Sequence, residues 1–226
     1  MSFSKEQLRD SLLLYAITDR AWIGEFAANE PSARQAICAQ VQAAIDGGAS
    51  FVQMREKNLS DWDMVDEADA LAAVCKAAGV PFVINDNVAI AIASRADGVH
   101  IGQDDMSAKD ARAVIGRGKI LGVSVQTVEQ AIAAEKAGAD YLGVGAVFPT
   151  SSKSDAAEVT HETLAAICKA VSIPVVAIGG INCENVSELS GSGIAGVAVI
   201  SALFAQENIT LAATQLKAAT NAALKN

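Results

Sequence analysis

Residues 81–105 read PFVINDNVAIAIASRADGVHIGQDD, and this stretch decides the fold of the 226-residue chain. It holds two short apolar runs, Pro81–Ile84 and Gly98–Gly102, separated by enough residues for two helical turns. A strand, a helix and a strand in this order predict a right-handed crossover between parallel neighbours. The carboxyl ends of the two strands should therefore meet at one edge of the sheet.

Acidic side chains come directly after both predicted strands. Asp86 follows the first and Asp105 the second, so the parallel arrangement should bring them together. Like charges at short distance repel unless a cation lies between them. Mg²⁺ suits such a place, because it usually binds one or two carboxylates together with waters and substrate phosphates. The stretch therefore predicts a magnesium site for a diphosphate.

The rest of the chain repeats the same unit. Similar joints between a helix and the next strand, with a glycine near the helix end, recur at 47–51, 96–99, 137–141 and 193–197, which is typical of repeated βα units. Strands are expected at 12–17, 51–55, 81–84, 98–102, 120–125, 141–147, 174–178 and 196–200. Helices are expected at 34–46, 60–78, 88–95, 108–115, 127–138, 160–170, 184–190 and 209–222.

Eight strands that alternate with eight helices predict an α/β fold, a (β/α)₈ TIM barrel. We expect a single domain at 1–226, with its core at about 12–222. A doubly wound open sheet is the alternative. Such sheets seldom hold so many regular units in so short a chain, and no GxGxxG follows the first strand.

Composition narrows the class of function. The net charge of −9 argues against a nucleic-acid partner. No apolar run reaches the roughly 18 residues of a membrane span. The four cysteines are widely spaced, without a CxxC motif or a preceding secretory segment. A reduced, soluble, cytoplasmic protein is expected.

In a TIM barrel, the residues after the strands build the active site. The second strand ends in QMREK at 53–57, with Gln53 and Arg55 on the same side of the strand. An arginine at the mouth of a barrel needs an anion to offset its burial, so we favour a phosphate ligand over a merely solvated loop.

Four further strand ends carry candidate site residues. Ser124 ends the fifth strand, where a serine bonded to the backbone is an equal alternative. The hydroxyl-rich loop FPTSSK at 148–153 is either a substrate lid or a mobile surface loop. Gly179-Gly180 and Ser201 follow the seventh and eighth strands, where phosphate sites are frequent. His100 falls in mid-strand, where packing is favoured over catalysis, and His161 is expected to be exposed at a helix start.

Six motifs in order closely resemble the thiamine-phosphate synthase family: QMREK at 53–57, Asn85-Asp86, GQDD at 102–105, GVS at 122–124, PTSSK at 149–153 and IGGI at 178–181. The resemblance runs roughly from Leu14 to Leu203. Members of that family join hydroxymethylpyrimidine diphosphate to a thiazole phosphate, releasing pyrophosphate and giving thiamine monophosphate. The resemblance thus implies a Mg²⁺-dependent transferase of thiamine biosynthesis with small-molecule substrates. It leaves a homo-oligomer open, as well as the choice between the plain thiazole phosphate and its carboxylate.

The resemblance also implies residue roles. The pyrimidine diphosphate would be bound by Gln53, Arg55, Lys57, Asn85, Ser124 and Lys153, of which Arg55, Lys57, Ser124 and Lys153 would act in catalysis. Mg²⁺ would be bound by Asp86 and Asp105. The thiazole phosphate would be bound by Thr150, Ser152, Gly180, Ile200 and Ser201.

Two departures and two rivals bear on this interpretation. Ser152 stands where the family commonly has threonine, and Gln126 where many members have histidine. A thiazole tautomerase, which shares the barrel, would need a proton shuttle near that second position. A non-catalytic phosphometabolite-binding barrel is the other rival, although an unused cluster of charges would cost stability.

Overall fold

The eight strands form a closed, all-parallel barrel in which β1 to β8 follow one another in sequence order and β8 pairs with β1. This computed structural model describes residues 4–24, 32–150 and 158–225. The expected TIM barrel is confirmed, and the open sheet is excluded. The strands are β1 (Leu14–Ile17), β2 (Phe51–Met54), β3 (Phe82–Asn85), β4 (Gly98–Ile101), β5 (Ile120–Val125), β6 (Tyr141–Val144), β7 (Val175–Ile178) and β8 (Gly196–Val199).

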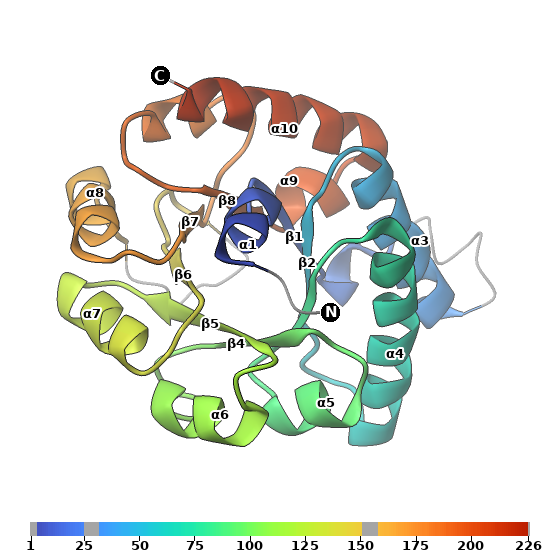
Figure 1. Ribbon diagram of the computed structural model, residues 1–226. Coiled ribbons are helices and arrows are strands. Elements are labelled where there is room, and N and C mark those ends of the chain that lie inside the picture. The colour runs from blue at the N-terminus through green and yellow to red at the C-terminus, as the bar shows by residue number, and fades with distance from the viewer. Residues whose placement is uncertain (1–3, 25–31, 151–157, 226) are drawn as a thin grey trace.

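Most helices surround the barrel, and α1 (Lys5–Ser11) lies across one end of it (Figure 1). The others are α3 (Ala33–Asp46), α4 (Asp61–Ala78), α5 (Val88–Ala93), α6 (Ala108–Ile115), α7 (Val128–Lys136), α8 (His161–Ala170), α9 (Ser201–Phe204) and α10 (Ile209–Leu224), with 3₁₀ turns η1 (Arg20–Trp22) and η2 (Val186–Leu189). Two details differ from expectation. The helix expected at 184–190 is only the short 3₁₀ turn η2, and the short helix α9 was not anticipated.

Polar caps start the helices that alternate with the strands. The Ser60 side chain accepts from the N–H of Asp63 at the start of α4, and Thr127 with Gln130 forms a capping box at the start of α7. Ser and Thr favour such positions because their oxygen satisfies a backbone N–H that has no partner within the helix. The loop after β2 is therefore held at its far end by the capped start of α4, and the loop after β5 by that of α7.

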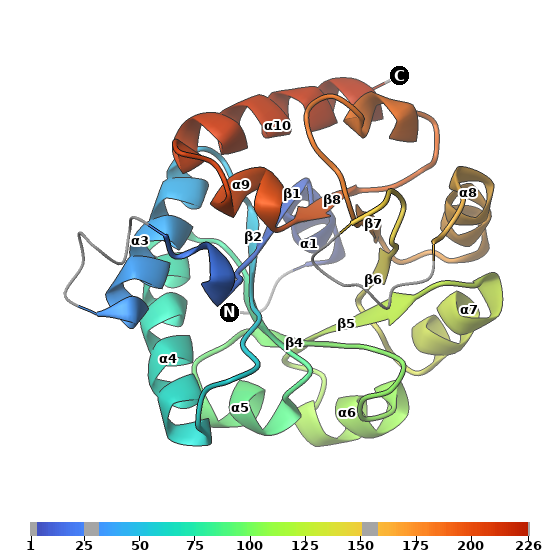
Figure 2. The ribbon, with the colours of Figure 1, turned by 180° about the vertical axis from the view of Figure 1, so that it is seen from behind.

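The buried core has two parts. Aliphatic side chains fill the layer between the sheet and the outer helices, whereas Tyr15, Phe51 and Tyr141 pack inside the barrel. Leu8 of α1 and Leu12 join this inner cluster. Figure 1 views the barrel from the end that α1 covers, and Figure 2 from the opposite end. With α1 over the amino-terminal end, the barrel interior is accessible from the carboxyl ends of the strands.

Two observations bear on the cysteines and on the possibility of a membrane-spanning helix. Cys75 is buried, Cys38 and Cys168 are partly buried, and Cys183 is exposed, all four as free thiols. Over the described residues, the helices are either too short or too polar to cross a membrane.

Candidate active site

A cavity of about 420 Å³ opens at the carboxyl ends of the strands, where sequence analysis predicted the site. It is lined by Gln53, Arg55, Lys57, Asn85, Asp86, Asp105, Ser124, Thr150, Gly180, Ile200 and Ser201. These are all the predicted site residues except Ser152 and Lys153, which lie outside the described residues. One cavity thus gathers predicted site residues that are up to 148 positions apart in the sequence, from Gln53 to Ser201.

The acidic wall is formed by the loops after β3 and β4, which are neighbouring parallel strands. Asp86 and Asp105 are exposed and line the cavity together with Asp104. The backbone of Asp86 has a φ of 61°, an uncommon conformation outside glycine that Asp and Asn tolerate best. Its Oδ2 accepts from the Asn85 side chain at 2.6 Å, and Oδ2 of Asp105 accepts from the N–H of Gly102 at 2.7 Å. Both carboxylates are therefore oriented by their own loops.

The basic wall comes from the segment after β2. Nη1 of Arg55 lies 3.4 Å from Oδ2 of Asp19, and the backbone N–H of Arg55 donates to Oγ1 of Thr18 at 3.0 Å. The Arg55 side chain is 17% exposed, so a ligand can reach a guanidinium that the β1 loop already holds in place. Lys57 is exposed at the cavity mouth. Two cations therefore face the acidic wall.

The opposite wall consists of the loops after β6, β7 and β8. Gly180 has a φ of 63°, and a Cβ there would lie 2.4 Å from the carbonyl oxygen of Pro149. Only glycine fits this position, because it tolerates a positive φ and allows the two loops to touch. Asn185 secures the turn by donating to the carbonyl oxygen of Gly180 at 2.9 Å. Ser201 begins the short helix α9 beside it. The wall offers backbone N–H groups and hydroxyls suited to a phosphate.

The floor holds groups that the sequence interpretation underestimated. His100 lines the cavity from β4, and both of its ring nitrogens are hydrogen-bonded, Nδ1 to the Tyr141 hydroxyl and Nε2 to Oγ of Ser124, each at 2.9 Å. The interior position of His100 was correctly predicted, but its role is a polar one. Tyr15 also lines the floor and was missed, along with Tyr141 below it. Alternation along β1 and β6 could have placed both rings inside the barrel.

The second histidine differs from expectation. His161 begins α8 and is partly buried, with its ring edge-on to Phe148 at a centroid distance of 5.3 Å. It was expected to be exposed, since a helix start is usually solvated. The ring of Phe148 packs against it instead.

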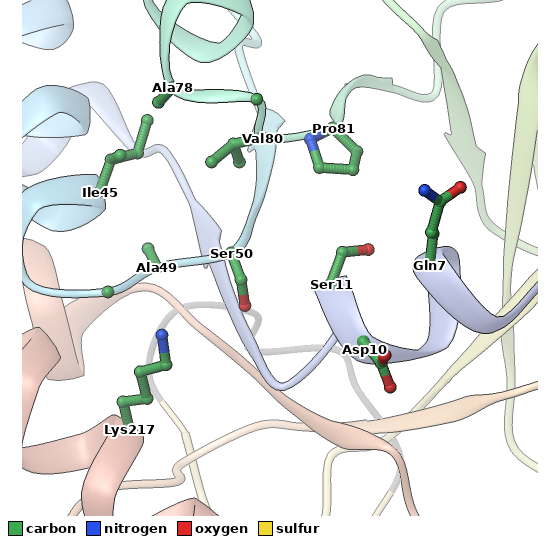
Figure 3. A pocket seen from close by; sticks show the side chains of 12 residues that line it. Gln7, Asp10, Ser11, Ile45, Ala49, Ser50, Ala78, Val80, Pro81 and Lys217 are labelled. Atoms are coloured by element: carbon green, nitrogen blue, oxygen red, sulfur yellow. The ribbon is translucent and has the colours of Figure 1, made fainter. Parts of the chain in front are cut away.

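A second hollow, of about 530 Å³, lies at the opposite end of the barrel, beside α1. Figure 3 shows its labelled side chains, among them Asp10 from α1 and Lys217 from α10. It is shallow and open, and it is lined by none of the predicted site residues. The cavity at the carboxyl ends is therefore the candidate active site.

A family model described as thiamine monophosphate synthase matches residues 14–203. The chain belongs to the thiamine monophosphate synthase family. Thiamine-phosphate synthase of Ruminiclostridium cellulolyticum is 51% identical over 176 residues, 78% of this chain and 84% of that protein. The corresponding protein of Coprothermobacter proteolyticus is 45% identical over 214 residues, 95% of this chain and 97% of that protein.

The solved structures include a thiamine phosphate pyrophosphorylase from Pyrococcus furiosus at 39% identity. Its TM-score is 0.84, and the match covers 96% of this chain and 99% of that one. The chain is therefore a member of an enzyme family, with the barrel of the thiamine monophosphate synthase family along nearly its whole length.

Proposed function

We propose that the chain joins hydroxymethylpyrimidine diphosphate to a thiazole phosphate, giving thiamine monophosphate and pyrophosphate. The observation that carries this proposal is one cavity that gathers an acidic wall, a basic wall and a wall of glycines and hydroxyls suited to phosphate. Family membership supports the same reaction. A cavity with two separate anion-binding regions fits a reaction between two phosphorylated substrates.

In this proposal the diphosphate lies between the basic and acidic walls. Arg55 and Lys57 would bind its oxygens, and Lys153 would complete this set from the loop after β6. Asn85 and Ser124 would contact the same substrate from β3 and β5, both of which reach the cavity. A guanidinium is well suited to this task because its planar donors match phosphate oxygens in pairs.

The acidic wall fits Mg²⁺ in its donor chemistry. Asp86 and Asp105 present oxygen ligands at the ends of adjacent strands. Among the described residues, no group of three or more His, Cys, Asp or Glu side chains could hold a metal ion. A pair of carboxylates is nevertheless enough for Mg²⁺, which takes its remaining ligands from water and substrate phosphates. When bound, the ion would neutralise the diphosphate and stabilise pyrophosphate as it leaves.

The chemistry requires a stabilised leaving group and close positioning of two substrates. The bond between the pyrimidine methylene carbon and the diphosphate oxygen breaks early, its electron pair leaves with pyrophosphate, and a pyrimidine carbocation remains. The thiazole nitrogen then donates its electron pair to that carbon. Arg55, Lys57 and Lys153 would stabilise the charge that develops on the leaving group, while the walls hold the reactants in contact.

The thiazole phosphate would lie at the opposite wall. Thr150, Ser152 and Ser201 would donate hydroxyls, and the backbone at Gly180 and Ile200 would donate N–H groups. The close approach of Gly180 to Pro149 supports this placement, because it brings the loops after β6 and β7 together. We also propose a cytoplasmic location, which the four free thiols support.

A coupling assay tests the proposed function. Purified protein is mixed with both substrates, with Mg²⁺ or with a chelator, and products are followed by mass spectrometry. Thiamine monophosphate and pyrophosphate should form only with Mg²⁺. Product in the presence of chelator would contradict the metal assignment alone. Absence of product, from folded protein that binds thiazole phosphate, would contradict the synthase function and favour a tautomerase or a binding protein.

A further inference from the structure

A chain of hydrogen bonds crosses the barrel interior beneath the cavity. Nε2 of Gln53 donates to the hydroxyl of Tyr15, which lies 2.8 Å from the hydroxyl of Tyr141. Tyr141 in turn bonds Nδ1 of His100, whose Nε2 bonds Oγ of Ser124, each at 2.9 Å. Gln53 and Ser124, the two ends of this hydrogen-bond chain, both line the cavity. They come from strands on different sides of the barrel.

The barrel keeps space for these rings at two glycines. A Cβ at Gly122 would lie 2.2 Å from Cζ of Tyr141 and 2.4 Å from Nδ1 of His100. A Cβ at Gly143 would lie 3.2 Å from Cε1 of His100. Inward-facing positions of a barrel are normally filled by side chains that pack the core. Here two such positions are left without one, so that the hydrogen-bonded rings fit.

The number of protons in the hydrogen-bond chain decides its direction. Tyr15 is fully buried and accepts from Gln53, so its single proton is satisfied by donation to Tyr141. Tyr141 then donates its own proton to His100, which must accept at Nδ1 and carry its proton at Nε2. That proton is donated to Oγ of Ser124. Burial raises the pKa of both tyrosines above the ordinary value, so both hydroxyls remain donors.

We propose that Tyr15, Tyr141 and His100 are positioning residues that fix which atoms Gln53 and Ser124 present to the pyrimidine substrate. With its amide nitrogen bonded to Tyr15, Gln53 presents its carbonyl oxygen as an acceptor. With its oxygen accepting from His100, Ser124 directs its hydroxyl proton into the cavity as a donor. The proposed substrate has a 4-aminopyrimidine ring. Its edge carries the complementary pair, an amino donor beside a ring-nitrogen acceptor. If the hydrogen-bond chain ran in the opposite direction, Gln53 would present a donor and Ser124 an acceptor, and neither would match the substrate.

This inference rests on the proposed function, but its first test does not require activity. The chain has two histidines, so His161→Asn leaves the ring of His100 as the single imidazole seen by ¹⁵N NMR. We expect the neutral tautomer with a proton on Nε2. Tyr141→Phe removes the donor to Nδ1 and should abolish that preference, whereas Tyr15→Phe should keep it. A proton on Nδ1 of His100, in the His161→Asn protein with both tyrosines intact, would overturn the proposed direction of the hydrogen-bond chain.

Kinetics then tests whether the hydrogen-bond chain acts on the substrate. Tyr141→Phe should raise KM for the pyrimidine diphosphate about tenfold, the usual effect of one buried hydrogen bond, and leave KM for the thiazole phosphate unchanged. Equal changes in both constants would overturn the positioning role. Tyr15→Phe, which cuts the bond to Gln53, should give the same split and serves if the first variant folds poorly. Thr220→Val, which removes a buried hydroxyl outside the hydrogen-bond chain, should change neither constant.

A double-mutant cycle separates positioning from general damage. If Tyr141 acts through Ser124, Tyr141→Phe should have a much smaller effect on KM in a Ser124→Ala background than in the native chain. Additive effects would overturn that route. Loss of coupling activity in the native chain, with the Nε2–H tautomer observed, would contradict the proposed function and leave the hydrogen-bond direction intact.

Discussion

Nε of Arg20 lies 3.0 Å from Oε2 of Glu56, the residue between the two cations of the β2 segment. Nη2 of the same arginine lies 2.6 Å from Oε2 of Glu67 on α4. Both carboxylate side chains are 3% exposed, and the second oxygen of each has no hydrogen-bond partner among the described residues. One guanidinium therefore compensates two buried negative charges. Because Glu56 lies between Arg55 and Lys57, this ion pair also fixes the segment that carries both cations.

Removing this guanidinium should destabilise the protein. Arg20→Gln would remove the direct ion-pair partner of both carboxylates, and we expect a loss of about 3 kcal/mol in the free energy of unfolding, at the low end for a buried pair because Arg20 is 30% exposed. Urea unfolding measures it. Arg34→Gln breaks the exposed pair with Asp66 and should cost less than about 1 kcal/mol. Equal losses in the two variants would refute the buried-charge argument.

The same cluster should make stability depend on pH through Glu67. Burial raises the pKa of Glu67 above its ordinary 4.5, so the native state holds a proton that the unfolded chain has released. The free energy of unfolding should therefore fall as the pH rises from 4.5 through the raised native value. Glu67→Gln keeps an oxygen for Arg20 but cannot titrate. Urea unfolding across this pH range should give a flatter profile for the variant, and identical slopes would contradict the assignment.

Substitutions of Asp86 should separate the effect of its backbone conformation from the effect of its charge. Asp86→Asn and Asp86→Gly both tolerate a positive φ, so we expect them to retain stability while losing Mg²⁺-dependent turnover. Asp86→Ala should lose turnover and also about 1 kcal/mol of stability, since alanine is strained there. Thermal unfolding and the coupling assay measure the two effects. Near-normal turnover in Asp86→Asn would rule out the carboxylate as a metal ligand.

Thr220 offers a stabilising substitution far from the site. Its hydroxyl is fully buried in α10 without a hydrogen-bond partner, which is costly for a polar group. Thr220→Val keeps the branched shape and removes the hydroxyl, so we expect a gain of about 1 kcal/mol in the free energy of unfolding. Differential scanning calorimetry should show a higher Tm with unchanged activity. A lower Tm would mean that the hydroxyl has a partner in the native state.

The barrel was predictable because its signals are local. Apolar runs, capping residues and helix-ending glycines each act within a few positions, and the parallel crossover then fixes which strand ends meet. Asp86 and Asp105 could be placed on one wall for that reason. Element ends were less accurate: β6 stops at Val144 rather than at 147, and Gly145 and Ala146 already line the cavity.

The floor of the site could not be predicted in the same way. The bond between Tyr15 and Tyr141 joins residues 126 positions apart, and no local pattern encodes it. Likewise, His100 reads as an ordinary interior residue until Gly122 is seen to leave room beside it. The partnership of Arg20 with Glu56 and Glu67 joins the β1 loop to α4, and the sequence offers only unrelated charges there.

The closure of the barrel by α1 has a kinetic consequence. Leu8 and Leu12 seal the end opposite the cavity, so a molecule on the floor leaves by the route it took in. In the proposed arrangement, a pyrimidine bound against Gln53 and Ser124 would be trapped once a thiazole phosphate lies above it. Substrate addition should accordingly be ordered, with the pyrimidine diphosphate first, and an unreactive thiazole analogue should slow its release rather than compete with it.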